Sequence, residues 1–326
     1  MAAAVDTSNT ELSKQYDTPM GLAHSTMQAL KDRIKLHYDL ASDYYLSLWG
    51  EHIHHGYWED GSETKEQAQV KLIQLLLQLS GVGENSNVLD VGCGIGGTSR
   101  YLASTLGCSV TGITISTKQV EIANRLTKAE AEKQASSAAA AAAAPASETS
   151  DKAKEIKADA DGFVPLGRGR IRFIELDAEK MGDFFAGQSA SFDAVWISEA
   201  LSHFPNKALF FENAFKVLKP GGKLALADWF KAENVTETEF ANDLKPIEDG
   251  MLLPPLCTQQ GYVDFAKGAG LSLLAGPKDI SKEVSRTCQG RDGIAFLQSF
   301  RAMRRGYANG TFRYAVISFE KPSGKA

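Results

Sequence analysis

Residues 88–97 read VLDVGCGIGG, an apolar segment that runs into a loop rich in glycine. The apolar residues predict a short buried strand, and GGTSRYLASTL at residues 96–106 predicts a helix. Glycines between a strand and a helix allow a tight turn and let a ligand approach the backbone beside the helix N-terminus. This stretch therefore predicts a strand–loop–helix unit that binds a ligand, with a tight turn that binds nothing as the alternative.

Strand and helix patterns alternate on both sides of this unit, which is typical of an α/β fold with a mostly parallel sheet. Further strands are predicted at Cys108–Ile115, Ile171–Leu176, Phe192–Ile197, Lys223–Ala227 and Phe312–Phe319. Further helices are predicted at Val70–Leu79, Thr117–Leu126 and Ala208–Leu218.

The composition excludes several classes of protein. The 326 residues are 43% hydrophobic, and 35 Lys plus Arg against 40 Asp plus Glu give a net charge of −5, which offers no basic field for nucleic acid. The 4 cysteines contain no CxxC pair, so neither a disulfide framework nor a zinc site is expected. No apolar run reaches the roughly 18 residues of a membrane span, and no targeting segment is recognisable. We expect a cytoplasmic protein that acts on a small molecule; the sequence does not indicate its oligomeric state.

We expect one domain at residues 23–322, after a disordered polar tail at residues 1–22. A low-complexity insertion at about residues 128–168 interrupts this domain and contains the alanine run Ala138–Ala144. Alanine favours helix, so the first part of the insertion is expected to prolong the preceding helix.

The glycine spacing alone leaves the ligand open, because Gly92-x-Gly94-x-x-Gly97 also fits a dinucleotide site. Asp90 at the strand end argues against that ligand, since a carboxylate attracts an ammonium group and repels a pyrophosphate. The next strand ends at Gly112–Ile115 without the acid that holds the ribose of NAD. A dinucleotide-dependent oxidoreductase therefore stays the alternative of another class.

Five segments carry a family resemblance: VLDVGCGIGGTSRYLA, VTGITISTKQ, the pair Asp177-Ala178, VWISEALSHF and VLKPGGKLALADW. In this order the chain resembles the class I S-adenosylmethionine-dependent methyltransferases over residues 30–320, apart from the insertion. HYDLASDYYLSLWGEHIHHGYW, ITIS-x-x-Q and FRYAVISFEKP narrow the resemblance to the group of gamma-tocopherol methyltransferase, sterol C-methyltransferases and cyclopropane-fatty-acid synthases. The resemblance implies a Rossmann-like, seven-stranded, mostly parallel sheet with helices on both faces and a helical N-terminal cover at residues 23–65.

The resemblance also implies a cofactor, S-adenosylmethionine, and residues that hold it. Asp90 and the glycine loop would hold the methionine part, and Asp177 would accept a hydrogen bond from the adenine amino group. Asp177 could instead be a helix N-cap. Thr114 stands where an acid usually holds the ribose, and the Gln119 amide can bond hydroxyl groups in its place. The predicted cofactor-binding residues are Tyr38, Asp90, Gly92, Cys93, Gly94, Gly96, Thr114, Gln119, Asp177 and Ala178.

Glu199 and His203 are the predicted catalytic residues. They follow the fourth strand, where a loop of an open α/β sheet faces the ligand cleft. Their spacing of four would place them on one helical face as a carboxylate–imidazole pair suited to proton transfer. The alternatives are that Glu199 only caps a helix and that His203 is a partly exposed histidine without a catalytic role.

The segment EHIHHGYW contains three histidines but no further Cys or His cluster, so no metal is predicted. Alternation along a strand would put His52 and His54 on one face and His55 on the other. From the resemblance, a substrate segment is expected at about residues 229–269, and the predicted substrate-binding residues are His55, Tyr57 and Leu253. The alternative is that the aromatic residues of the cover and the apolar run Met251–Leu256 only pack in the core and bind no substrate.

The sequence thus predicts methyl transfer from S-adenosylmethionine to a small, largely apolar metabolite, in secondary metabolism. A gamma-tocopherol-like aromatic or amine acceptor is favoured, and a sterol-type alkene comes second. A non-catalytic protein that binds the cofactor is a further alternative.

Overall fold

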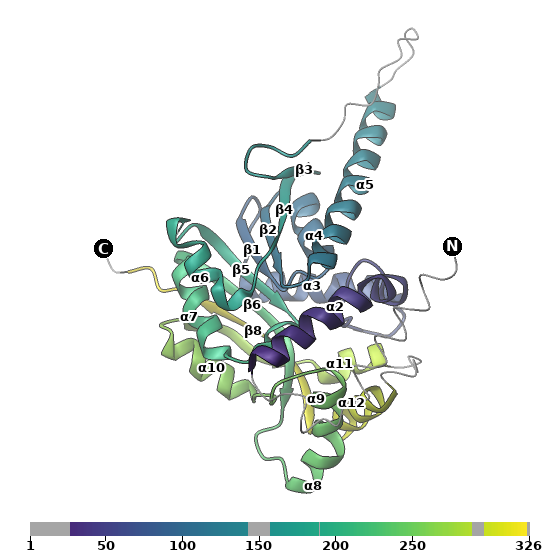
Figure 1. Ribbon diagram of the computed structural model, residues 1–326, viewed down its shortest axis with the longest axis vertical. Coiled ribbons are helices and arrows are strands. Elements are labelled where there is room, and N and C mark those ends of the chain that lie inside the picture. The colour runs from purple at the N-terminus through teal and green to yellow at the C-terminus, as the bar shows by residue number, and fades with distance from the viewer. Residues whose placement is uncertain (1–26, 143–156, 189, 289–296, 325–326) are drawn as a thin grey trace.

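The computed structural model describes residues 27–142, 157–188, 190–288 and 297–324. Figure 1 shows a central twisted sheet with helices on both faces. Over these residues the sheet has eight strands in the order β3-β4-β2-β1-β5-β6-β8-β7. Their bounds are β1 Asn87–Val91, β2 Ser109–Thr114, β3 Val164–Leu166, β4 Gly169–Glu175, β5 Phe192–Ser198, β6 Leu218–Lys231, β7 Ser272–Asp279 and β8 Phe312–Glu320.

Strands β4, β2, β1, β5 and β6 run parallel, whereas β8 pairs antiparallel with both β6 and β7. The predicted α/β class with a mostly parallel sheet is therefore confirmed. The helices are α2 Met27–Trp49, α3 Lys65–Ser80, α4 Gly97–Leu106, α5 Thr117–Ala142, α6 Met181–Phe184, α7 Lys207–Val217, α8 Glu237–Glu239, α9 Lys245–Gly250, α10 Gln259–Gly268, α11 Ser281–Val284 and α12 Leu297–Asn309. Single 3-10 turns follow β4 and β5, at η1 Ala178–Lys180 and η3 Leu201–His203.

The core lies on both faces of the sheet, as alternation along β5 shows. Ala194 and Trp196 belong to one apolar cluster, with α3 and β8, and Val195 and Ile197 belong to the other, with α7 and α10. Strands buried on both faces read as continuous apolar runs, which is why the sequence shows them clearly. None of the described helices combines the length and apolarity that a bilayer crossing needs.

The sheet has one strand more than the predicted seven, because β3 forms inside the segment interpreted as an insertion. Leu166 packs into the core with 1% exposure, and Gly167, at φ +57°, turns the chain back into β4. Before it, α5 continues to Ala142 and projects beyond the body of the protein (Figure 1). The rest of the alanine run and the tail at residues 1–22 lie outside the described residues.

Helix α2 lies over the carboxyl ends of the parallel strands. Its Lys31 contacts Asp177, which follows β4, and its Lys35 contacts Ile115, which follows β2. In Figure 1 the helix, in purple, crosses the front of the molecule. Helix α2 therefore forms one wall of any binding site at that edge of the sheet.

Candidate active site

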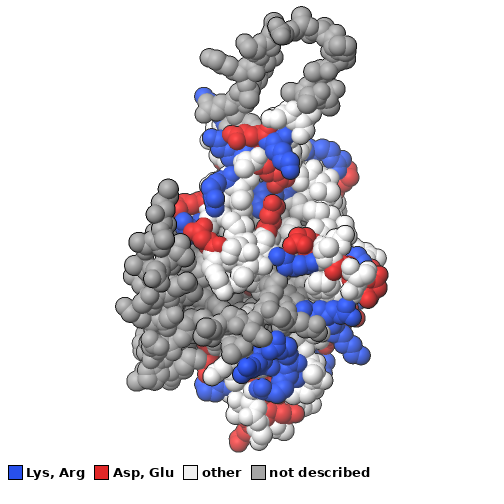
Figure 2. All heavy atoms as spheres, turned by 90° about the vertical axis from the view of Figure 1, so that its right-hand side faces the viewer, with Lys and Arg blue, Asp and Glu red and all other residues white. Residues whose placement is uncertain are grey.

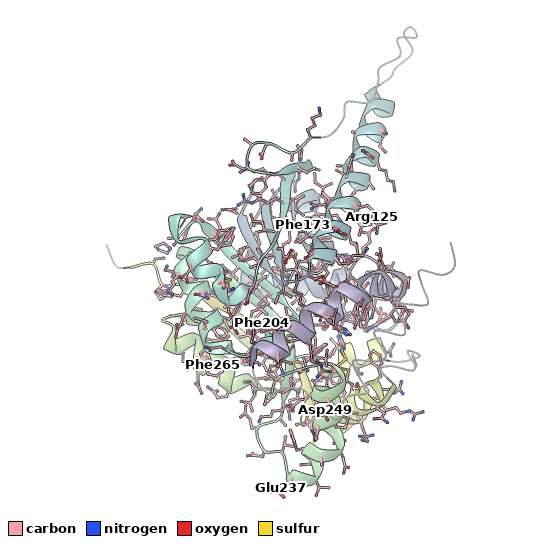
Figure 3. All side chains as sticks on the ribbon, in the orientation of Figure 1. Arg125, Phe173, Phe204, Glu237, Asp249 and Phe265 are labelled. Carbon is pink, nitrogen blue, oxygen red and sulfur yellow. The ribbon has the colours of Figure 1, made fainter. Side chains whose placement is uncertain are left out.

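A cavity with about 820 Å³ of empty space, partly open to solvent, lies at the carboxyl ends of the parallel strands. Loops after β1, β2, β4 and β5 form its floor, and α2 forms its cover. Phe204 closes one side next to the N-terminal half of α2 (Figure 3). The cavity brings together these predicted residues: Tyr38, Gly92, Gly94, Thr114, Gln119, Asp177, Ala178, Glu199 and His203.

A second cavity of about 350 Å³ adjoins the first, since both are lined by Gly92, Gly94 and Ser198. Asp90 lies in it with 3% exposure, and its hydrogen-bond partner is the neutral Ser99 hydroxyl. Burial raises the pKa of Asp90 to about 7, against the opposing effect of the Ser99 hydrogen bond. A buried carboxylate in a cavity is suited to a ligand with an ammonium group, such as the methionine part of S-adenosylmethionine.

The glycine loop takes a backbone path that side chains would block. Gly92 and Gly96 have φ values of +69° and +80°, and a Cβ at Gly92 would lie 2.3 Å from the Ala200 side chain. At Gly96 it would meet the ring of Phe173. Cys93 lines the second cavity. Gly96 is the N-cap of α4, so the loop delivers the helix N-terminus to this cavity.

The first cavity also contains the polar residues that the resemblance assigns to the ribose and the adenine. The Thr114 hydroxyl donates to the Gln119 side-chain oxygen at 2.6 Å, which leaves the amide nitrogen of Gln119 as a donor. Asp177 accepts the Glu179 amide at 3.0 Å and the Lys31 ammonium at 2.9 Å. Asp177 is therefore the N-cap of η1, the alternative considered above, and it still lines the cavity.

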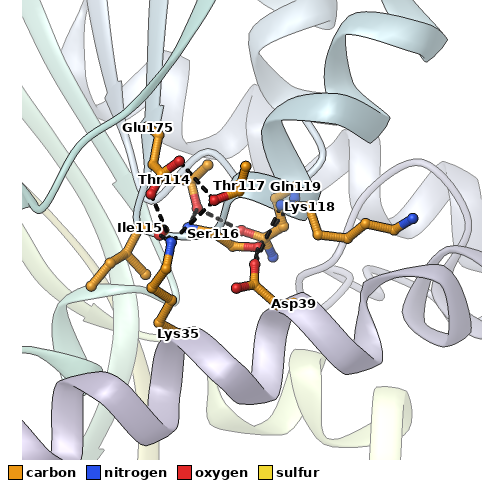
Figure 4. A network of polar contacts seen from close by, with 9 residues as sticks. All are labelled: Lys35, Asp39, Thr114, Ile115, Ser116, Thr117, Lys118, Gln119 and Glu175. Carbon is orange, nitrogen blue, oxygen red and sulfur yellow. Dashed lines mark hydrogen bonds and ion pairs between the residues drawn. The ribbon is translucent and has the colours of Figure 1, made fainter. Parts of the chain in front are cut away.

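Charged side chains at four-residue intervals fasten α2 onto the loop after β2 (Figure 4). The Lys35 ammonium donates to the Ile115 carbonyl at 2.9 Å and to the Glu175 carboxylate at 2.7 Å. One Asp39 oxygen accepts the Ser116 hydroxyl and the Lys118 amide. The sequence shows only half of this arrangement. Lys31, Lys35 and Asp39 are spaced by four and so share one face of a helix, but their partners lie far away in the chain.

Replacing Lys35 by Met should weaken S-adenosylhomocysteine binding by roughly three- to tenfold, because α2 loses charge-assisted hydrogen bonds to the loop that carries Thr114. The Lys35 side chain is 34% exposed, so solvent limits the effect. Isothermal titration measures it, with Lys128→Met on the exposed side of α5 as the control. An affinity within twofold of the wild type in a folded Lys35→Met protein would contradict this fastening role.

Glu199 follows β5 in a left-handed backbone conformation, with φ +53°. One carboxylate oxygen accepts the His55 amide at 2.6 Å and the Tyr314 hydroxyl at 2.8 Å, and the other is 2.9 Å from His55 Nδ1. Burial alone would raise the pKa of Glu199, but His55, through its charge and hydrogen bonds, more than offsets this and leaves the pKa below its usual value. A strained, ionised carboxylate on a cavity wall is typical of a functional position.

His203 lies in η3, and its Nε2 is 3.1 Å from the Tyr38 hydroxyl of α2. Burial first, and then the charges of His37 and Lys207, lower the pKa of His203 to about 3, so the ring is neutral. The predicted pairing of Glu199 with His203 on one helical face is wrong. The left-handed residue 199 breaks the helix, and α7 begins only at Lys207.

The EHIHHGYW segment is not a strand. The His52 and His54 rings nevertheless lie together, 5.3 Å apart beside the second cavity, while His55 turns to Glu199. The Gln69 amide donates to the carbonyls of His52 and His54 and holds the segment in place. In the part of the chain that the structure describes, no cluster of Cys, His, Asp and Glu could hold a metal.

None of the three predicted substrate-binding residues lines either cavity, and His55 turns to Glu199. Tyr57 packs against the core cluster, and Leu253 is a core residue with 4% exposure. The neighbouring Leu252 packs on Leu30 and Ile34 of α2 instead. Cavity residues that the sequence analysis did not identify include Lys31, Ile53, Ser198 and Phe204 in the first cavity and Glu51, His52, His54 and Thr98 in the second.

Several known proteins are similar to this chain in sequence or in fold. The family model of mycolic acid cyclopropane synthetase matches residues 24–152, and a methyltransferase domain model matches residues 89–226. Tocopherol O-methyltransferase of Arabidopsis thaliana is 28% identical over 338 residues, which cover 92% of this chain and 85% of that protein. The 2-methyl-6-phytyl-1,4-hydroquinone methyltransferase of Synechocystis is 35% identical over 186 residues, 56% of this chain and 45% of that protein. A solved cyclopropane synthase from Mycobacterium tuberculosis shares the fold, with a TM-score of 0.62, 18% identity and coverage of 90% of this chain and 98% of that one.

The chain is a class I S-adenosylmethionine-dependent methyltransferase. Within that class it belongs to the group of tocopherol methyltransferases, sterol C-methyltransferases and cyclopropane synthases. Its cofactor is therefore S-adenosylmethionine, and the oxidoreductase alternative has no support.

Proposed function

We propose that this enzyme methylates an aromatic phenol or amine that carries an apolar portion, an acceptor of gamma-tocopherol type. The enzyme acts on a small, largely apolar metabolite, and the finer assignment rests on one observation. The first cavity combines apolar walls, such as Ile34 and Phe204, with a polar edge made by Glu199, His203 and Tyr38. A flat ring with one hydroxyl or amino group complements such a surface.

The named relatives support this choice. The Arabidopsis protein is a tocopherol methyltransferase and the Synechocystis protein acts on a phytyl hydroquinone, so both are named for aromatic acceptors with an apolar chain. A sterol-type acceptor is kept as an outcome of the test, because sterol 24-C-methyltransferases are also relatives, at 26% to 28% identity.

The cofactor supplies a methyl group on a sulfonium centre, and the residues of this chain prepare its transfer. Asp90 would hold the ammonium group, Thr114 and Gln119 the ribose, and Asp177 the adenine. With the methyl group supplied from the sulfonium centre, the Glu199 carboxylate would accept the proton that the acceptor loses.

The remaining cavity residues keep the reactants aligned. The neutral His203 and the Tyr38 hydroxyl orient the polar group of the acceptor towards Glu199. Helix α2 keeps water out while its polar contacts to the β2 loop hold. We also propose that the predicted cover at residues 23–65, of which 27–65 are described, acts as the lid of the site. The predicted substrate segment at about 229–269 packs on this cover through Leu252, and we propose that it helps to select the acceptor.

Incubation with methyl-labelled S-adenosylmethionine and a panel of acceptors tests the proposal. The panel contains gamma-tocopherol, a phytyl hydroquinone, an aryl amine and cycloartenol, and mass spectrometry follows the label. We expect labelled gamma-tocopherol or hydroquinone. Label on cycloartenol alone, or on no member of the panel, would contradict the aromatic assignment.

Location and partners stay predictions. A cytoplasmic location rests on the sequence alone, and the Arabidopsis relative is a chloroplastic protein. In the upper part of the face drawn in Figure 2 basic and acidic side chains are interspersed. The net charge of −5 favours a small-molecule acceptor over a nucleic acid. Membership in secondary metabolism is likewise proposed from the sequence.

A further inference from the structure

Lys207, the first residue of α7, is a buried lysine with 6% exposure. Its ammonium group donates to the Ser202 carbonyl at 3.2 Å and to the Phe204 carbonyl at 3.0 Å. These two carbonyls belong to the residues on either side of His203. Lys207 does not line the first cavity, whereas His203 does.

Asp228 on β6 holds the same turn from the other side. It is 1% exposed, and one of its oxygens accepts the Ser202 amide at 2.8 Å and the Tyr262 hydroxyl at 3.2 Å. Its other oxygen accepts the Trp229 amide at 2.8 Å. The backbone of Ser202 is therefore held from both sides. Its N–H donates to the buried Asp228 carboxylate, and its carbonyl accepts the buried Lys207 ammonium.

This arrangement is unfavourable for the helix that carries it. A cation at the first position of a helix opposes the helix dipole, and burial of an ammonium group has a desolvation cost that lowers the pKa of Lys207. Asn206 already caps α7 by accepting the Leu209 amide. The helix therefore does not need Lys207 to begin, and the contacts that Lys207 makes are those to the turn.

We propose that Lys207 is a positioning residue that, together with Asp228, fixes the turn Leu201–Phe204 so that His203 faces Tyr38 and the acceptor. This inference rests on the proposed function, in which His203 orients the acceptor. Lys207 acts through the two carbonyls and takes no part in proton transfer. Lys207 donates its hydrogen bonds to this turn, whereas the loop after β4 is held to α7 through Glu179, which accepts the Asn206 amide.

A double-mutant cycle tests this role with labelled S-adenosylmethionine and gamma-tocopherol as substrates. Lys207→Met should lower kcat about tenfold and change the KM of S-adenosylmethionine and the affinity for S-adenosylhomocysteine less than twofold. In a His203→Ala background, the same substitution should lower kcat further by less than twofold, since no ring is left to position. Lys216→Met on the exposed side of α7 is the matched control and should leave all three quantities unchanged.

Histidine side-chain NMR spectra give a readout independent of activity. The resonance that is missing in His203→Ala should shift or broaden in Lys207→Met, while the other histidine signals stay in place. Should Lys207→Met not fold, Asp228→Asn takes its place in the cycle with the same expected non-additivity.

The outcomes separate this inference from the proposed function. The positioning role is overturned if Lys207→Met leaves kcat unchanged, or if it lowers kcat equally in the wild type and in His203→Ala. In either case a loss of activity in His203→Ala alone would still support the proposed role of His203. If His203→Ala itself keeps full activity, the proposed role of His203 fails, and the positioning role fails with it.

Discussion

An Asp90→Asn protein should fold and yet bind S-adenosylhomocysteine at least a hundredfold more weakly than the wild type. The Asp90 carboxylate is buried in the second cavity, where it is the group placed to neutralise the ammonium of the methionine part. Removing one partner of a buried ion pair costs about 3–5 kcal/mol, which corresponds to a factor of roughly 10² to 10³ or more in affinity. Isothermal titration and thermal unfolding measure the two properties.

The fold should survive because the wild-type carboxylate is itself unfavourable. Folding raises the pKa of Asp90 from its usual range to about 7, so the wild type loses stability as the pH rises through that interval and the buried group ionises. Asparagine keeps the shape and can still accept the Ser99 hydrogen bond. Asp183→Asn on the exposed side of α6 serves as the control for binding.

The pH dependence of binding gives the same substitution a second test. The cofactor needs the ionised form of Asp90, so binding releases a proton below pH 7, and the wild-type affinity should fall about tenfold per pH unit there. At a higher pH, where the amino group of the ligand loses its proton, the affinity should fall again. A wild-type affinity that stays constant between about pH 5.5 and 7 would contradict the assignment of Asp90.

The sequence predicts the strand–loop–helix unit around the glycines well because that unit is local. The strand, the glycines and the helix N-terminus lie within residues 87–106, and their backbone requirements appear directly as residue types. The buried parallel strands are predicted for the same reason, as continuous apolar runs. Strand β7 was not predicted because its residues are almost all exposed at the edge of the sheet and show no apolar pattern.

The partners of Glu199 could not be predicted, because they are distant in the sequence. His55 lies 144 residues away from Glu199 in the chain, and Tyr314 lies 115 residues away. The four-residue spacing of Glu199 and His203 suggested a local pair. The left-handed backbone at residue 199 points the carboxylate to the cover segment instead, and a positive φ at a glutamate has no signal in the sequence.

Glu199→Gln should lower kcat by a factor of about 10² to 10³ and change the affinity for S-adenosylhomocysteine less than twofold. A general base contributes factors of about 10² to 10⁴, and an amide cannot take the acceptor proton. Single-turnover methyl transfer measures the chemical step. Tyr314→Phe is the matched control, because it removes one hydrogen bond to Glu199 and keeps the carboxylate, and we expect a loss below tenfold. A Glu199→Gln protein with a kcat within tenfold of the wild type would contradict the assignment.

A base can be told from a structural acid by chemical rescue. Glu199 is bonded to the His55 amide and the Tyr314 hydroxyl, so a loss of activity in Glu199→Gln could arise from movement of the cover segment. In Glu199→Ala the shortened side chain leaves space beside these donors, and formate can bring a carboxylate to it. Formate, and not chloride, should restore part of the methyl transfer if the carboxylate takes the proton. Equal activity in both salts, together with altered S-adenosylhomocysteine affinity, would assign Glu199 to holding the cover segment.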